Sequence, residues 1–470
     1  MKLIHLFWAS MIACIVYAFT IDIGFGLAYF GAIVPLMLGL VYCRKLVYIN
    51  HILILIVIIF LWVFYLFRPL FLIKNPSFYK YGYISPDISV HYEPLVYLSI
   101  LNFISMISII GILRLFANTK VSELFKIQPL REFPTFFMIF GLFIMTMYAL
   151  FSFLASKGSS VFLVLQNYSE LLLFVQLILP VAIAFIVINN FSLKGGRRNI
   201  IAYLIVLLYS LSLLIQGSKS FLIEIALVFF FFIVIFRGNF KISLIGFIGV
   251  GIFVALIAGS FPVAMALRWI TYTDGLTFDI VTIINRIDLI TSKSGVDYIA
   301  FGIDLITRRF NGYDGMVLIS ETNIAPFQGS FSVTIMIENF LASLIPGYSS
   351  GNRAFGIAVS DIFHNFRSRD VSHGGAVAHY GMFFLMAGGS LLGVAVALLI
   401  FNIAWSLLAY LALRLKMDPL LRYMLCGSVI IMSSLLFSGG NFDRMIWRIS
   451  LLFLQVFALA GLMKLRFKRY

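Results

Sequence analysis

Runs of about 20 consecutive apolar residues recur along almost the whole chain. A bilayer core about 30 Å thick requires a helix of that length, because backbone amides and carbonyls that face lipid must be hydrogen-bonded within their own segment. Of the 470 residues, 62% are hydrophobic and only 11% are charged, whereas soluble domains carry about 25% charged residues. These features exclude a water-soluble enzyme and predict an integral membrane protein.

The apolar runs predict an all-α polytopic membrane protein with about 12 transmembrane helices. The second run follows the first at once, and residues 18–21 make a poor cleavage site, so we expect the first run to be a retained helix rather than a signal peptide. The expected spans are residues 3–19, 22–42, 46–67, 94–116, 135–155, 170–190, 200–216, 221–236, 242–265, 384–413, 423–438 and 449–463.

The basic residues predict how these spans are oriented, because cytoplasmic loops carry an excess of Lys and Arg. With the N-terminus inside, 19 of the 34 basic residues but only three of the 19 acidic residues fall in the inside connections. The inside connections thus account for the whole net charge of +15, so nucleic acid is not needed to explain it. We expect both termini to be cytoplasmic.

One outside connection, residues 266–383, is far longer than the others, and residues 68–93 form a second, shorter one. Loops longer than about 12–15 residues are usually functional or disordered. Apolar residues recur every three or four positions at 280–290 and 296–308, so we expect one large helical periplasmic loop that covers the outer mouth of the bundle. The expected organisation is nine spans in residues 1–265, the large loop in residues 266–383, and three spans in residues 384–470.

The large loop is rich in arginine, although outside loops normally lack cations. The guanidinium fork fits phosphate oxygens bidentately, as a lipid-linked pyrophosphate at the headgroup plane would require. Residues 307–315 add an aromatic side chain and a carboxylate around a glycine turn, a combination found in sugar sites and also in solvated turns. For any single arginine, pairing with the loop's own acids is the simpler interpretation. The candidate substrate-binding residues of this loop are Arg268, Arg286, Arg308, Arg309, Tyr313, Asp314 and Arg353.

Three histidines, His364, His373 and His379, fall within sixteen residues of the large loop. Histidine can take the proton of a sugar hydroxyl near neutral pH. Metal binding is the weaker interpretation, because neither HxxxH nor HExxH spacing is present. The candidate catalytic bases are His373, His379, Asp361 and Glu224, and we expect no metal and no cofactor.

A tight outer turn, Gly-Ser-Lys-Ser at residues 217–220, separates two spans, and Glu224 follows about one helical turn later. An ionisable residue inside an apolar helix is by default a functional candidate. Lys219 and Glu224 lie five positions apart, about 140° around one helix, which disfavours a direct pair between them. Two interpretations stay open: a substrate-facing role, with Lys219 as a further binding residue, and a capping turn in which Ser220 is the N-cap.

This layout resembles the O-antigen polymerase (Wzy-type) family of oligosaccharide repeat-unit polymerases. The resemblance rests on the topology of the full chain, on the Gly-Ser-Lys-Ser turn at 217–220, and on the stretch that leads from residues 346–353 to His379-Tyr380-Gly381 and the glycines at 388, 389 and 393. The chain departs from some members in one respect: no arginine of the outside loops is followed by a glycine eleven residues later.

The resemblance implies a GT-C-like, metal-independent glycosyltransferase of the bacterial inner (cytoplasmic) membrane. Such an enzyme moves a growing glycan from undecaprenyl pyrophosphate onto the sugar of an incoming undecaprenyl-pyrophosphate-linked oligosaccharide, and so makes O-antigen or a similar surface polysaccharide. The diphosphate would be contacted by Lys219, Arg268, Arg308, Arg309 and Arg353. The implied partners are the lipid-linked oligosaccharide, the lipid bilayer, and a chain-length regulator and flippase of the same pathway, without nucleic acid.

Three alternatives remain open at the level of sequence. An O-antigen ligase-like glycosyltransferase would share the architecture and differ in its acceptor. A flippase for lipid-linked oligosaccharides also has about twelve spans, but such transporters usually have related halves and short loops. A non-catalytic partner subunit is the third, because no motif in the chain is specific for catalysis.

Overall fold

The computed structural model is almost entirely helical, and no strand occurs among the residues that it describes. The structure describes the continuous stretches and two isolated positions given by residues 3–43, 46, 48–74, 87–115, 120, 135–155, 169–191, 200–215, 221–237, 280–294, 312–321, 390–414, 419–438 and 453–458. It also describes scattered positions between 259 and 270, at 298, 334 and 338, and between 380 and 387.

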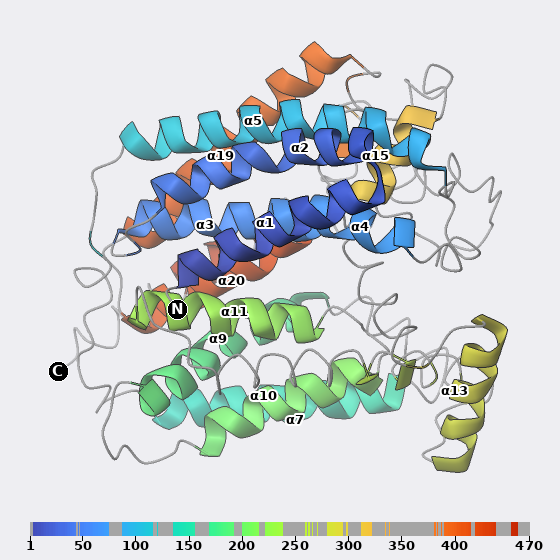
Figure 1. Ribbon diagram of the computed structural model, residues 1–470. Coiled ribbons are helices and arrows are strands. Elements are labelled where there is room, and N and C mark those ends of the chain that lie inside the picture. Colours follow the sequence, from blue (N-terminus) through green and yellow to red (C-terminus); the bar gives the residue numbers. More distant parts are fainter. Residues whose placement is uncertain are drawn as a thin grey trace. The chain divides into compact units, whose positions relative to one another are not determined.

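The chain divides into two compact units, and the first comprises Met1–Val121, Phe310–Arg414 and Met432–Leu451. Within it, α2 packs against α1, α3 and α5, and α5 also packs against α19 (Figure 1). Its described elements are α1 (Leu3–Ile21), α2 (Ile23–Tyr42), α3 (Ile49–Leu61), the π-helical turn η1 (Trp62–Leu66), α4 (Phe67–Lys74), the 3-10 turn η3 (Ile88–His91), α5 (Tyr92–Leu115), α15 (Gly312–Glu321) and α19 (Leu391–Arg414).

The second unit comprises Ser122–Arg309, Leu415–Ile431 and Leu452–Tyr470. In it α10 packs against α7, α9 and α11, and α9 contacts α7 and α11. Its described helices are α7 (Thr135–Ala155), α9 (Ser169–Phe191), α10 (Ile200–Ile215), α11 (Phe221–Arg237), α13 (Ile280–Ser294) and the first part of α20, whose bounds are Pro419–Ser438.

The helices follow the apolar runs closely, because the length of each run sets the length of its helix. Seven of the eight expected spans between residues 3 and 236 coincide with helices to within a few residues, as does 423–438. The third helix continues through α4 to Lys74, seven residues past the expected end at 67, and α19 begins seven residues after the expected start at 384. A helix is also present over 280–290, where the periodicity predicts one. The expected span 242–265 lies mostly outside the described residues, and 449–463 is described as helix only over 453–458.

Five of the described helices are long and apolar enough to cross a membrane. Several shorter apolar helices accompany them in the described part of the chain. The fold is therefore that of a polytopic helical membrane protein. The five are Leu3–Ile21, Ile23–Tyr42, Ile49–Phe71, Ile88–Leu115 and Leu391–Leu411.

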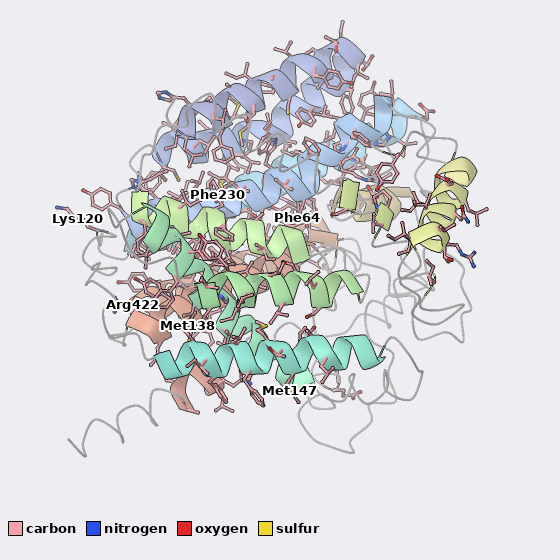
Figure 2. All side chains as sticks on the ribbon, turned by 90° about the horizontal axis from the view of Figure 1, so that it is seen from below. Phe64, Lys120, Met138, Met147, Phe230 and Arg422 are labelled. Carbon is pink, nitrogen blue, oxygen red and sulfur yellow. The ribbon has the colours of Figure 1, made fainter. Side chains whose placement is uncertain are left out.

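Exposed apolar stripes on these helices support a lipid environment. On α19 the exposed large hydrophobic residues recur every three or four positions and so form one face of the helix, from Leu392, which is 76% exposed, to Leu411. Monomeric soluble proteins rarely expose apolar patches of this extent. On α7, where Figure 2 labels Met138 and Met147, the exposed large hydrophobic residues are Ile139, Phe140, Phe143 and Leu150. The stripe on α19 consists of Leu392, Val396, Leu399, Ile400, Ile403, Leu407 and Leu411.

Candidate functional site

A π-helical turn interrupts the third membrane-spanning helix just before the site. The backbone N–H of Phe67 donates to the carbonyl of Trp62, five residues earlier, instead of the usual four. The hydroxyl of Tyr29 on α2 donates to the carbonyl of Leu66 at 2.9 Å. This contact gives a carbonyl at the end of the turn a partner deep inside an apolar bundle, where an unpaired one would be costly. π-turns of this kind are frequent at functional sites.

Directly after the π-turn, Arg68 forms a buried ion pair with Asp314 of α15. The Nε of Arg68 donates to both carboxylate oxygens, Oδ1 at 3.1 Å and Oδ2 at 3.2 Å. The arginine side chain is 2% exposed and the aspartate side chain 21%. A buried charge requires a partner of opposite sign, so this pair fixes the N-terminal turn of α15 against α4.

A second contact, between His91 and Tyr313, fixes the same turn of α15. His91 Nδ1 lies 2.7 Å from the hydroxyl oxygen of Tyr313, and the two rings stack with centroids 5.7 Å apart at 10°. Both residues are fully buried. The short turn η3 that carries His91 is capped by Asp87, whose Oδ1 accepts from the N–H of Ser89 at 3.0 Å. Hydrogen bonds from the backbone N–H and from the side chain of Ser89 hold the pKa of the exposed Asp87 carboxyl below its ordinary value.

Tyr380, near the other end of the large loop, also contacts the π-turn. Its backbone N–H donates to the hydroxyl of Tyr65 at 3.1 Å, and the two rings lie 4.6 Å apart. The hydroxyl of Tyr380 donates to Oδ1 of Asn102 at 3.0 Å and lies 2.8 Å from the Oγ of Ser105. Because a hydroxyl has one proton, this geometry makes Ser105 the donor to Tyr380.

The polar contacts continue along α5 through an otherwise apolar interior. The amide of Asn102 donates to the carbonyl of Ala32 on α2 at 2.9 Å. The amide of Asn402 on α19 donates to Ser108 at 3.0 Å, and Ser108 donates to the carbonyl of Ser105. Asn and Ser are common links between membrane helices, because their side chains satisfy one another where water is absent.

The connection between α1 and α2 lies at the same end of the first unit as the ion pair. Asp22 caps α2 by accepting from the N–H of Phe25 at 2.8 Å, and it also accepts from the hydroxyl of Tyr92, the first residue of α5, at 2.7 Å. These two hydrogen bonds hold the pKa of the Asp22 carboxyl below its ordinary value, the backbone N–H of Phe25 contributing most. In the predicted orientation this end faces outward.

The opposite end of α5 carries basic residues. The guanidinium of Arg114 lies 4.9 Å from the ring centroid of Tyr42, and the backbone of Lys120 bridges to Tyr48. The side-chain amide of Asn50 on α3 donates to the carbonyl of Leu113 on α5 at 2.8 Å and so connects these two helices at this end. The two ends of α5 thus differ in charge, with Glu93 in the first turn and Arg114 in the last turn.

The structure brings two of the predicted site residues together with ionisable partners, namely Tyr313 and Asp314. Arg286 lies on α13 in the second unit, partly buried, and Glu224 lies within α11. The other predicted residues are outside the described part of the chain, and these are Lys219, Arg268, Arg308, Arg309, Arg353, Asp361, His373 and His379.

Sequence reasoning missed Arg68, His91 and Tyr65 as site residues. Arg68 and His91 lie near the two ends of the unusually long outside connection 68–93, and Arg68 follows an apolar run. An ionisable residue at that place is a functional signal that could have identified it. Tyr380 was noticed only as part of a motif. Tyr65 gives no signal in the sequence, because a tyrosine within an apolar run is ordinary.

The described cluster holds the guanidinium of Arg68, the imidazole of His91, the carboxylate of Asp314 and the phenols of Tyr65, Tyr313 and Tyr380. Such side chains can form hydrogen bonds, stabilise charge and transfer protons. Among the residues that the structure describes, no group of three or more His, Cys, Asp or Glu side chains could hold a metal ion. No family model, no curated protein and no solved structure matches this chain.

Proposed function

We propose that this protein is a membrane glycosyltransferase that polymerises undecaprenyl-pyrophosphate-linked oligosaccharide repeat units at the periplasmic face of the bacterial inner membrane. The products would be O-antigen or a similar surface polysaccharide. Two grounds support the proposal: the sequence resembles the O-antigen polymerase family, and the fold is that of a helical membrane protein. It includes the expected arrangement of 12 spans, a GT-C-like architecture and cytoplasmic termini.

The observation that carries the proposal is the attachment of α15 to the helix bundle. Tyr313 and Asp314, which the sequence predicts to bind substrate, contact His91 and Arg68 at the end of α5 opposite the basic residues. This attachment joins α15, one segment of the predicted outer loop, to the helices of the first unit. It supports the proposal because it gathers ionisable groups at the end of the bundle that we expect to face outward. A rigid support of this kind is what a reaction site needs to hold its groups in place.

The reaction needs two kinds of residue. A hydroxyl of the acceptor sugar attacks the anomeric carbon of the donor glycan, a new glycosidic bond forms, and the bond to undecaprenyl pyrophosphate breaks. The leaving diphosphate gains negative charge, which Lys219, Arg268, Arg308, Arg309 and Arg353 would stabilise. The proton of the acceptor hydroxyl passes to a base, for which His373, His379, Asp361 and Glu224 are the candidates.

Reconstitution of the purified protein into liposomes tests this proposal. With purified lipid-linked repeat unit as the only substrate, we expect glycan chains to lengthen with no other protein present. Chain growth without a partner would exclude a flippase and a non-catalytic subunit as the main activity. In a second reaction that also contains lipid A core, transfer to the core without lengthening would make the protein a ligase and contradict the proposal.

Two substitutions test the role of the loop arginines. We expect Arg309→Ala and Arg353→Ala each to abolish long glycan while the amount of protein in the membrane stays the same. Lys120→Ala is the matched control, because it removes an exposed cation from a connection that we expect on the cytoplasmic side. If both loop variants polymerise normally, the assignment of these arginines to the diphosphate is wrong.

A further inference from the structure

Residues 315–379 of the large loop begin and end at one turn of the third membrane-spanning helix. Asp314, just before this segment, is bound by Arg68. Tyr380, just after it, donates its backbone N–H to Tyr65. Tyr65 and Arg68 are three residues apart, so they occupy neighbouring positions on one face of the helix. Two chain positions far apart in sequence are therefore attached to the same short stretch of helix.

The π-turn sets the direction of both attachments. A π-turn holds one more residue than an α-turn, so every later residue is rotated by about 100° relative to an unbroken α-helix. Tyr65 lies within this turn and Arg68 directly after it. Tyr29 stabilises the π-turn, because its hydroxyl donates to the Leu66 carbonyl.

Burial makes these attachments strong. Tyr65, Tyr313 and Tyr380 are fully buried, and Arg68 is 2% exposed. Water cannot replace a hydrogen bond that breaks in such surroundings, so release of either end leaves a buried polar group unpaired. The two attached ends are thus expected to be held rigidly.

We propose that Tyr65 and Arg68 are positioning residues that fasten the two ends of residues 315–379 to the π-turn η1. Arg68 sets the position of Asp314, and Tyr65 sets the position of the peptide that joins His379 to Tyr380. The proposal rests on the proposed function in one point, namely that His379 is a candidate base of the reaction. The fastening itself is a property of the fold.

Hydrogen exchange measured by mass spectrometry on the full-length protein in nanodiscs tests the fastening directly. We expect Arg68→Ala to speed exchange of the amides in 312–321 about tenfold and to leave the peptide around Tyr380 unchanged. Tyr65→Phe should speed exchange around Tyr380 and leave the amides in 312–321 unchanged, because it removes the acceptor of the Tyr380 N–H. A tenfold change corresponds to about 1.4 kcal/mol of opening free energy. Lys120→Ala should change neither peptide.

Polymerisation by the same variants separates positioning from a general loss of stability. We expect Tyr65→Phe to lower kcat about tenfold with KM changed less than twofold, and Arg68→Lys to recover much of the activity that Arg68→Ala loses. Unchanged exchange in both point variants would overturn the fastening, whatever the glycan assay gives. Changed exchange in a protein whose wild type makes no polymer would leave the fastening in place and refute the proposed function.

Discussion

Arg68 and Asp314 are 246 positions apart in the sequence, yet the Nε of the arginine lies 3.1 Å from Oδ1 of the aspartate. Removing one partner of a buried pair leaves the other charge without compensation, which costs about 3 kcal/mol or more. The partial exposure of Asp314 places the expected loss at the lower end of this range. We expect Asp314→Ala to lower the apparent melting temperature of the purified protein in detergent.

The double variant Arg68→Leu/Asp314→Leu is the matched control for this prediction. It removes both charges, so it should be more stable than Asp314→Ala alone, as buried pairs replaced by apolar residues often are. Together with the single variants Arg68→Leu and Asp314→Leu, it gives the coupling between the two positions by a double-mutant cycle. Additive effects of the two single substitutions would mean that the pair contributes nothing.

Tyr380→Phe is expected to destabilise the first unit. The substitution removes one hydroxyl that donates to Asn102 and accepts from Ser105, and both of those side chains are buried. Leaving a buried polar group unsatisfied costs about 1–3 kcal/mol. Thermal unfolding in detergent measures the loss. Ser99→Ala is the control, since its hydroxyl bonds within its own helix to the carbonyl of Val96, and it should melt close to the wild type.

The positions of the helices could be predicted from the sequence because each depends on the local length of an apolar run. The partners of Tyr313 and Asp314 could not, because Arg68 and His91 reach α15 only through tertiary packing. The π-turn could not be predicted from the sequence for another reason. Residues 62–66 are as apolar as the helix around them, and no residue type indicates where a helix holds an extra residue. A polar residue within a span, such as Asn102, predicts a hydrogen bond to another helix, but the sequence does not indicate which residue is the partner.

Gly26→Ala is expected to disturb the turn from α1 into α2. A Cβ at Gly26 would lie 2.9 Å from the backbone Cα of Phe19 as well as close to its ring. Backbone cannot move aside as a side chain can, so we expect a loss of about 1–3 kcal/mol. Gly111→Ala on α5 is the matched control, because a Cβ there meets nothing within 4 Å. Alanine favours a helix by up to about 1 kcal/mol over glycine, so the control should be as stable as the wild type or more so. Equal melting temperatures of the two variants would contradict this packing.

Asp22 is expected to make the stability of the first unit sensitive to acid. Its pKa in the folded protein lies below the ordinary value of about 3.9, because Phe25 and Tyr92 donate to the carboxylate. A lowered folded pKa contributes stability that is present above pH about 4 and is lost as the pH falls through the folded pKa. Asp22→Asn lacks this contribution, so its melting temperature should approach that of the wild type as the pH falls from 6 to about 3. A constant difference between the two proteins over this range would contradict the assignment.

Ser89 and Lys120 are expected to lie on opposite sides of the membrane. Both are exposed, and they flank α5, whose 24 residues span about 36 Å, enough to cross the hydrocarbon core. The positive-inside pattern places Lys120 in the cytoplasm. In a background that lacks Cys14, Cys43 and Cys426, an impermeant thiol reagent should label Ser89→Cys in intact spheroplasts and Lys120→Cys only after the membrane is permeabilised. Labelling of Lys120→Cys alone in intact spheroplasts would invert the orientation. Labelling of both would mean that α5 does not cross the membrane, and the assignment of residues 68–93 and 266–383 to the outside would then fail.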